Sequence, residues 1–428
     1  MKWFLTRLCY LAAIATFFYA SYSFANYFAA MRQNVPEIFF SWERQIPFWA
    51  WSIVPYWSLN LLYGFGFLLC KSKAELRRYT LQLFLAQIVA SAFFILTPLQ
   101  ISWQKPESSG FFGFLFDSLL AFDKPFNQAP SLHIILSVIV GSLYMSKARQ
   151  IWLKCLLFAW FALIVVSVLT TFQHHFIDIP TGLLVGFLVL LFVPLDGEIL
   201  KPKRNFVTPR HLKQAAIYGF FAVLSLFVAL AARGWALWLV YISVSFFLVA
   251  LAYLLFGCEI FRKGQNGRLQ TAAKILLLPY LLVARVNIFY WLRHDSLYDE
   301  ILPGIYLGSI VAAPKFSAIF DLTAECEYRP RNAQIYENFA LLDMTQPSLI
   351  ELCSAAAKFN ELASLGERTL ICCALGYGRS AVVLATWLAR YKNFSVQEAI
   401  NLIKSSRKRA VVEGYENLLR NFAKEAKC

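Results

Sequence analysis

A cysteine and an arginine six positions apart form the clearest chemical pattern in this sequence of 428 residues. Cys373 ends an apolar stretch typical of a buried strand, and Arg379 opens a stretch with the spacing of an amphipathic helix. Glycines in the loop between them let backbone N–H groups converge on an anion, and the start of a helix adds a positive partial charge. The intervening loop residues are Ala374, Leu375, Gly376, Tyr377 and Gly378.

This arrangement predicts a phosphate site with a nucleophilic thiolate. An electropositive helix start favours the thiolate form of Cys373, and the fork of Arg379 matches two phosphate oxygens. Ser380, directly after the arginine, offers a hydroxyl that can stabilise the sulfur as a leaving group. The alternative is an ordinary buried cysteine, since this spacing is common by chance, but the strand, glycines and helix together favour the phosphate site.

Histidines form a second pattern. The chain has five, and His133, His174 and His175 fall at predicted ends of apolar segments. His174 and Asp178 are four residues apart, so on a helical turn they share a face and can hydrogen-bond. A carboxylate on one ring nitrogen leaves the other poised as nucleophile or base. The alternatives are interfacial side chains satisfied by water, or a weak metal site. Two loops that contribute histidines to one side favour phosphoryl transfer, in which one histidine attacks and another protonates.

Composition indicates a polytopic membrane protein. Hydrophobic residues make up 59% of the chain and charged residues 15%, against roughly 25% charged in soluble proteins. This excludes a soluble cytoplasmic enzyme and a disordered chain. The first apolar run is expected to be a retained helix, not a cleaved signal peptide, because more spans follow. We predict eight spans at 5–29, 47–70, 79–99, 131–146, 151–172, 176–195, 213–232 and 235–257.

Loop charges predict the orientation of these spans. Lysines and arginines are frequent in 71–78, 147–154 and 196–213 and scarce in 100–130 and 172–176, so both termini should be cytoplasmic and the histidines should face the outer side. Residues 1–294 contain 25 Lys and Arg against 10 Asp and Glu, and the remaining 134 are balanced at 15 against 15. The basic excess therefore belongs to membrane loops, and we expect no nucleic-acid partner.

The sequence divides into a membrane domain at 1–260, an amphipathic linker at 261–296 and a compact domain at 297–428. Within the linker, Pro279, Arg285 and Asn287 interrupt an apolar stretch, which favours a helix lying in the membrane interface. A ninth span is the alternative, and it would place the last domain outside the cytoplasm.

Around the histidines, roughly over residues 80–195, the sequence resembles the type-2 phosphatidic acid phosphatase superfamily of membrane lipid phosphatases and phosphotransferases. Pro130 to His133 matches its Pro-Ser-x-His element, and His174 to Asp178 matches its last element. The resemblance implies that His174 is the nucleophile, Asp178 its orienting partner and His133 the general acid. Lys124 and Ser131 are the candidate phosphate-binding residues of this site.

This segment departs from the common lipid-phosphatase pattern. The usual phosphate-binding arginines are absent: no arginine occurs between Arg78 and Arg149, and Val168 follows Ser167 where the other would fall. The run that ends at His133 instead resembles the inositol-phosphoceramide and sphingomyelin synthase branch, which transfers a lipid head group between lipids. Head-group transfer is therefore an expected activity beside hydrolysis.

The last domain, over about 297–425, resembles the dual-specificity branch of the protein tyrosine phosphatase superfamily, also in the segments 302–309 and 320–326. The resemblance implies a general acid upstream of the nucleophile. Asp343 lies 30 residues before Cys373 and is the candidate, a capping or solvated aspartate being the alternative. Cys372 stands where the family usually has histidine. The loop has no lysine at 374 or 375, which argues against highly phosphorylated inositol head groups.

Together these patterns predict a polytopic all-α membrane domain of about eight helices followed by an α/β dual-specificity-phosphatase-like domain. We expect an outward-facing lipid phosphatase or phosphotransferase joined to a cytoplasmic cysteine phosphatase, in the inner (plasma) membrane of a bacterium. Expected partners are membrane lipids and a phospholipid or phosphoprotein substrate, with no metal or cofactor. Two alternatives stay open: a membrane part that is only an anchor or transporter-like scaffold, and a catalytically dead phosphate-binding module.

Overall fold

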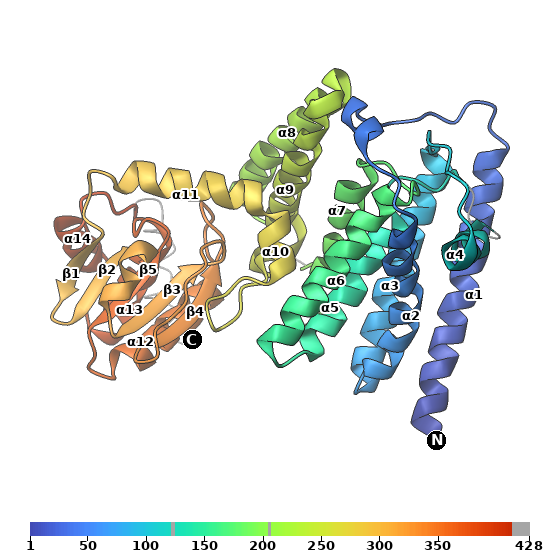
Figure 1. The fold of residues 1–428 in the computed structure, drawn as a ribbon. Helices are drawn as coiled ribbons and strands as arrows, with labels where there is room; N and C mark the ends of the chain where they lie inside the picture. The colour runs from blue at the N-terminus through green and yellow to red at the C-terminus, as the bar shows by residue number, and fades with distance from the viewer. Residues whose placement is uncertain (121–124, 204–206, 413–428) are drawn as a thin grey trace. The chain divides into compact units, whose positions relative to one another are not determined.

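The computed structural model of the chain describes residues 1–120, 125–203 and 207–412. It divides into two compact units, residues 1–199 and 200–428 (Figure 1). The first is helical, and the second joins further helices to a β-sheet domain.

The first unit is a bundle of helices joined at alternating ends (Figure 1). The ends of α1, α3 and α6 and the starts of α2, α5 and α7 gather at one end of the bundle. The lysine- and arginine-rich turns after α2 and α5 lie at the opposite end. The elements are α1 (Lys2–Ala30), η1 (Ser41–Gln45), η2 (Ala50–Ser52), α2 (Ile53–Leu69), α3 (Lys73–Leu96), α4 (Gly110–Leu120), α5 (Leu132–Lys147), α6 (Ile151–Thr170) and α7 (Asp178–Phe192).

In the described part of the chain, six helical segments are long and apolar enough to cross a membrane, fewer than the eight predicted from sequence. The predicted spans at 131–146 and 176–195 correspond to α5 and α7, which have only 16 and 15 residues. At 1.5 Å per residue each is about 24 Å long or less, short of a hydrocarbon core of roughly 30 Å. The six are Lys2–Ala30, Ala50–Leu69, Lys73–Leu96, Ile151–Thr170, Pro209–Ala232 and Gly234–Phe261.

Helices α5 and α7 pack closely because α7 presents glycines to α5. A Cβ placed on Gly182 would lie 2.8 Å from the carbonyl oxygen of Ser131 and 2.7 Å from Ile134 Cβ, and one on Gly186 would lie 2.8 Å from Val138 Cβ. Only glycine permits this approach without displacement of α5. It brings the loop before α5 against the turn before α7, and both carry candidate site residues.

The second unit starts with a helical hairpin and continues into two helices that lead to the sheet (Figure 1). The backbone N–H of Tyr280, near the start of α11, donates to Ser245 Oγ of α9 at 3.3 Å, so α11 is fastened to the hairpin. The elements are α8 (Pro209–Ala232), η3 (Gly234–Trp238), α9 (Leu239–Leu251), η4 (Ala252–Phe256), η5 (Gly257–Phe261), α10 (Thr271–Leu276) and α11 (Leu278–Leu292).

A five-stranded mixed sheet forms the rest of this unit, in the order β1-β2-β5-β3-β4. Only β1 is antiparallel to its neighbour, and the other pairs are parallel. The carboxyl ends of the parallel strands therefore meet at one edge, where ligand sites of α/β domains form. The elements are β1 (Tyr298–Leu302), β2 (Ile305–Ser309), η6 (Ile310–Lys315), β3 (Ala318–Thr323), β4 (Ile335–Leu341), α12 (Leu349–Ala363), β5 (Thr369–Cys373), α13 (Arg379–Tyr391) and α14 (Val396–Ser406).

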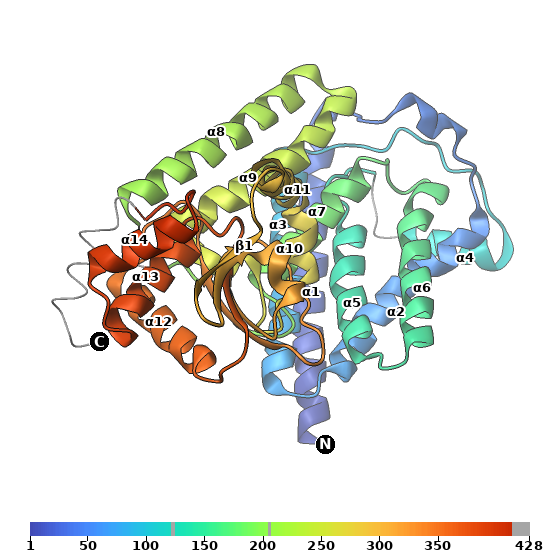
Figure 2. The ribbon, with the colours of Figure 1, turned by 90° about the vertical axis from the view of Figure 1, so that its left-hand side faces the viewer.

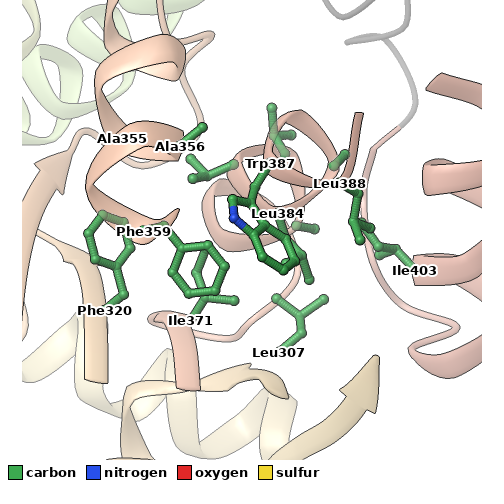
Figure 3. Packing of buried hydrophobic residues seen from close by; sticks show 14 of the residues in the cluster. Leu307, Phe320, Ala355, Ala356, Phe359, Ile371, Leu384, Trp387, Leu388 and Ile403 are labelled. Atoms are coloured by element: carbon green, nitrogen blue, oxygen red, sulfur yellow. The ribbon is translucent and has the colours of Figure 1, made fainter. Parts of the chain in front are cut away.

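The sheet is covered differently on its two faces. Helices α12, α13 and α14 gather on one side and α11 lies on the other (Figure 2). Trp387 of α13 is the centre of the first layer, 1% exposed, with Phe359 of α12 and Ile371 of β5 around it (Figure 3). Since side chains alternate along a strand, Leu370 and Cys372 of β5 point to the opposite layer, with η6.

The segment between the hairpin and α10 is anchored in the sheet by a buried ion pair. Lys263 Nζ lies 2.5 Å from Asp321 Oδ2 and also donates to the carbonyl oxygen and Oγ1 of Thr323, at 2.9 and 2.8 Å. The two charged side chains are 1% and 0% exposed, and Tyr336 OH donates to the same carboxylate oxygen at 2.7 Å. The network satisfies every proton of the ammonium group, as a buried charge requires.

Lys263→Met is expected to destabilise this unit by about 3–5 kcal/mol because it leaves the Asp321 carboxylate buried without its partner. Lys358→Met is the matched control: its ion pair with Glu337 is 46% and 36% exposed, and such pairs contribute about 1 kcal/mol or less. The measurement is the thermal unfolding midpoint of each full-length variant in detergent. Equal shifts in the two variants would contradict the role given to Lys263.

Candidate active sites

The loop from Cys373 to Arg379 connects β5 to α13 at the carboxyl edge of the sheet. Four consecutive carbonyl groups of the loop bond to atoms outside it, so they do not compete for its N–H groups. Ala374 O accepts from Ser309 Oγ at 2.6 Å, Leu375 O and Gly376 O each accept from the Arg407 guanidinium at 2.9 Å, and Tyr377 O accepts from Val411 N at 2.8 Å. The loop is thus an anion-binding nest set up before a ligand arrives.

The Cys373 sulfur lies inside this loop. It accepts from Gly376 N at 3.2 Å and from Ser380 Oγ at 3.3 Å, so two donors point at the sulfur. Gly376 has a φ of 77°, and a Cβ there would lie 2.3 Å from the backbone of Gly308 in β2. The curl of the loop therefore requires glycine at 376.

Cys372 points away from the site. Its thiol donates to the carbonyl oxygen of Phe320 at 3.5 Å, on the sheet face opposite to Cys373. Burial raises the pKa of the Cys372 thiol well above its ordinary value, and the nearby Asp321 carboxylate raises it further. Cys372 is therefore a packing residue that stays protonated, next to the candidate nucleophile in sequence but on the other side of the sheet.

Arg379 is held in place by carboxylates and a carbonyl. Its guanidinium makes two bonds to Glu325, at 2.6 and 3.0 Å, donates to Leu341 O at 2.9 Å, and lies 3.2 Å from Asp343 Oδ1. Burial opposes the charge on Arg379, but the two carboxylates outweigh it and raise the arginine pKa. Burial likewise opposes ionisation of Glu325, yet Arg379 lowers the pKa of that carboxyl. The pair therefore stays charged, with the arginine fixed beside the loop.

Asp343, the acid predicted from sequence, lies in the turn after β4 and belongs to the same site through its contact with Arg379. The protein around it desolvates the carboxyl and raises its pKa, although Arg379 opposes this and 46% of the side chain is exposed. Its backbone carbonyl accepts from Tyr253 OH of η4 at 3.1 Å. Tyr253 thus connects the helical hairpin to the turn that carries the acid.

In the first unit, His174 and Asp178 form the expected pair. Nδ1 of His174 lies 3.0 Å from Asp178 Oδ2, and its Nε2 lies 3.1 Å from Ser131 Oγ. Asp178 is fully buried, and the backbone N–H of His175 also donates to it at 3.1 Å. The carboxylate therefore fixes the ring so that Nε2 faces Ser131, in the loop before α5.

His133 lies in the first turn of α5, in electrostatic range of His174. Its ring stacks on Tyr56 with centroids 3.9 Å apart, and its buried Nε2 has no hydrogen-bond partner among the described residues. The structure therefore brings His133, His174, Asp178 and Ser131 to one end of the bundle. Lys124 lies outside the described residues.

Several contacts at this end had no sequence signal, although His175 itself was noted with the other histidines. His175 accepts at Nε2 from the Ser102 N–H (3.1 Å) and lies 3.3 Å at Nδ1 from Glu43 Oε2, so it fastens three segments together. Lys105 Nζ donates to Gln173 Oε1 at 2.7 Å and brings a cation next to the histidine turn. In the second unit, the roles of Glu325, Arg407 and Ser309 were likewise not predicted.

Among the described residues, no group of three His, Cys, Asp or Glu side chains could hold a metal ion.

Comparison with protein families matches each site to a separate domain. Residues 49–192 match the model of the PAP2 superfamily, and residues 305–425 match that of the dual specificity phosphatase, catalytic domain. The chain thus combines a PAP2 superfamily domain with a dual-specificity phosphatase catalytic domain, as the sequence motifs predicted. No match was found among curated proteins.

Solved structures are similar over less than a third of the chain. A mouse putative dual specificity phosphatase complexed with zinc tungstate is 19% identical, covering 30% of this chain and 87% of its own, with a TM-score of 0.27. Tk-PTP in the active form is 23% identical (30% and 95%, TM-score 0.26), and human DUSP28 is 19% identical (31% and 97%, TM-score 0.27). At these TM-scores they carry no argument about activity.

Proposed function

We propose that the protein is a two-site membrane phosphatase, in which the Cys373 site hydrolyses phosphomonoesters through a thiophosphate intermediate. The thiolate of Cys373 attacks phosphorus, and the bond to the leaving oxygen breaks as Asp343 gives that oxygen its proton. Arg379 and the loop N–H groups bind the phosphoryl oxygens. Water then attacks phosphorus, gives a proton to the Asp343 carboxylate, and releases phosphate and the thiolate, with Ser380 stabilising the sulfur.

The bracing of the loop is the observation that carries this proposal. All four carbonyls from Ala374 to Tyr377 bond outward, to Ser309, Arg407 and Val411. A decayed module would have no need of a thiol, an arginine and a carboxylic acid collected at a braced loop. Preorganised donors that cost no reorganisation during the reaction are the largest single source of catalysis in many enzymes.

For the first unit we propose phosphoryl chemistry on lipids, either hydrolysis or head-group transfer. His174 would attack phosphorus with its ring oriented by Asp178, and His133 would protonate the leaving oxygen. Support comes from the 3.0 Å contact between His174 and Asp178 and from the buried Nε2 of His133, which has no hydrogen-bond partner in the described part of the chain. Because the usual arginines are missing, Lys105 near Gln173 is the described cation best placed to help bind phosphate.

We also propose that the histidine site faces the outer side of the membrane and that the cysteine site and both termini are cytoplasmic. The alternating loop charges support this orientation. A reducing cytoplasm suits a free thiolate nucleophile. The substrate classes are membrane phospholipids for the first site and a phospholipid or phosphoprotein for the second, in the inner membrane of a bacterium.

Asp343→Ala is expected to slow an alkyl phosphate, which has a poor leaving group, by about 10²–10⁴-fold. It should slow p-nitrophenyl phosphate much less, because that leaving group needs no proton. Since the raised pKa of Asp343 keeps the carboxyl protonated to higher pH, wild-type turnover of the alkyl phosphate should fall as pH rises through that pKa. This decline should be absent from Asp343→Ala.

The measurement is phosphate release by the full-length protein in detergent, from pH 4 to 9 on both substrates (roughly the range in which an aspartate of raised pKa titrates). Glu361→Gln, an exposed carboxyl on α12, is the matched control and should leave both profiles unchanged. Equal slowing of the two substrates in Asp343→Ala would show that Asp343 only positions Arg379.

A further inference from the structure

A cavity of about 660 Å³ lies between α11 and the face of the sheet domain that carries η6. One wall is a row of α11 side chains from Leu278 to Arg293, and the other includes Ile310, Val311 and Pro314 of η6. The volume is in the range of small-molecule sites, roughly 300–1,000 Å³. Most of the lining is apolar, so the cavity suits a hydrocarbon group.

The outer side of α11 is exposed and apolar. Val283, Val286 and Tyr290 are 56%, 67% and 52% exposed, although the helix buries Leu281 and Leu292 against its own domain. Asn287 interrupts this exposed face, and a mostly apolar face with single polar residues is typical of a helix that lies in a membrane interface.

The position of α9 indicates that lipid surrounds α11. The start of α11 is fastened to Ser245 of α9, and α9 belongs to the candidate membrane span Gly234–Phe261. Ser245 lies within that span, so the start of α11 is next to a segment that is apolar enough to cross the bilayer. The hydrocarbon group at hand for the cavity is therefore a lipid acyl chain.

Charge at the cavity favours an anionic lipid. Leu282, Arg285, Phe289 and Arg293 follow one another at helical spacing, so they form one ridge of α11, and all four line the cavity. Among the described residues, no ion pair joins Arg285 or Arg293 to a carboxylate. By contrast, Lys274 is paired with Glu327 at 2.7 Å. Arg293 lies over the Tyr290 ring, 4.1 Å from its centroid. Since neither arginine has a carboxylate partner among the described residues, both can bind a head-group phosphate beside the apolar cavity.

We propose that this cavity binds one acyl chain of an anionic membrane phospholipid, with the head-group phosphate at Arg285 and Arg293. The site is separate from the loop of Cys373, because none of residues 373–380 lines the cavity. Glu325 is shared: it lines the inner end of the cavity and makes both bonds to Arg379. The proposal concerns binding alone and stands whether or not the proposed catalysis is correct.

The test is photolabelling of the full-length protein in nanodiscs of phosphatidylcholine that contain phosphatidylglycerol with a diazirine at the end of one acyl chain. Labelled residues are identified by mass spectrometry. We expect label on Ile310 in addition to the more exposed Val311 and Pro314, because Ile310 is only 7% exposed and a chain must enter the cavity to reach it. Label confined to Val283, Val286 and Tyr290 would overturn the proposal, since it reports a bilayer against the outer face only.

Two matched variants sharpen the result. Ile288→Trp fills the cavity and should lower labelling of η6 by about fivefold or more. An acyl chain could then enter only by overpacking the site, which is costly. Val286→Trp adds the same side chain to the exposed outer face and should leave that labelling unchanged. Equal labelling in the two variants would contradict the cavity site. If Ile288→Trp fails to fold, Val311→Trp, on the half-exposed opposite wall, replaces it.

A separate experiment tests the contact between the head-group phosphate and the arginines. Arg285→Gln/Arg293→Gln should remove the preference for the diazirine phosphatidylglycerol over a phosphatidylcholine probe with the same chain. An unchanged preference would overturn the assignment of the phosphate to these arginines. Protection of the η6 wall from hydrogen exchange in detergent without phospholipid, together with no lipid label there, would instead assign the cavity to a protein segment.

Discussion

Replacing Cys373 by serine is expected to abolish hydrolysis of p-nitrophenyl phosphate, whereas replacing Cys372 is expected to preserve it. Loss of an enzyme nucleophile typically costs about 10⁴-fold or more, because no other group is placed to attack. Cys373 has that position: its sulfur accepts from Gly376 N and Ser380 Oγ inside a braced loop. Phosphate release by purified full-length protein measures both variants.

Cys372→Ser is the matched control, since it makes the same atomic change one residue away. Its thiol points to the opposite sheet face and donates to Phe320 O, a bond that a serine hydroxyl can also make. We expect a small loss of stability and turnover within about tenfold of wild type, the cost of a polar group at a buried site being roughly 1–3 kcal/mol. An inactive Cys372→Ser beside an active Cys373→Ser would reverse the assignment of the nucleophile.

The sequence predicted the strand, the turn and the helix around Cys373 correctly because all these parts are contiguous. Strand, glycines, arginine and helix start occupy residues 369–391, so local propensity is enough to place them. The residues that brace the loop come from elsewhere: Arg407 lies 31 residues from Gly376, and Glu325 lies 54 residues from Arg379. An isolated arginine or glutamate carries no local signal of its partner, so these residues could be found only from the fold.

In the first unit the sequence predicted the positions of the helices better than their lengths. Loop charge and hydropathy located α1, α2, α3, α5, α6 and α7, but not α4, which lies in the predicted loop at 100–130. Over the whole chain they gave eight spans, where six segments of the described residues have the required length. Periodicity does not fix helix ends: Ser131 begins α5 as its N-cap, and Val193 ends α7. His175 shows the same limit, since its contacts with Glu43 and Ser102 depend on segments 132 and 73 residues away.

The second large effect is expected at the histidines of the membrane unit. His174→Ala should lower turnover of a phospholipid or its head-group analogue by about 10⁴-fold or more, as removal of a nucleophile does. The double variant His133→Ala/His174→Ala should be no slower than His174→Ala, because groups that act as a unit give non-additive losses. Assays in a Cys373→Ser background remove the contribution of the second site. His294→Ala, at an exposed position of the other unit, is the control.

The outcome of this experiment separates a catalytic membrane domain from an anchor. An anchor has no reason to bury Asp178 fully within 3.0 Å of a histidine, or to leave His133 Nε2 buried without a partner among the described residues at the same end of the bundle. A buried unpaired polar atom costs roughly 1–3 kcal/mol, a cost that a substrate contact at His133 would offset. Lipid turnover that survives in the double variant would therefore contradict the assignment and leave the first unit as a support for the phosphatase. Suppose instead that the double variant loses turnover and that the wild-type site is faster with an acceptor lipid than with water alone. The site then transfers head groups, as the absence of the usual phosphate-binding arginines predicts.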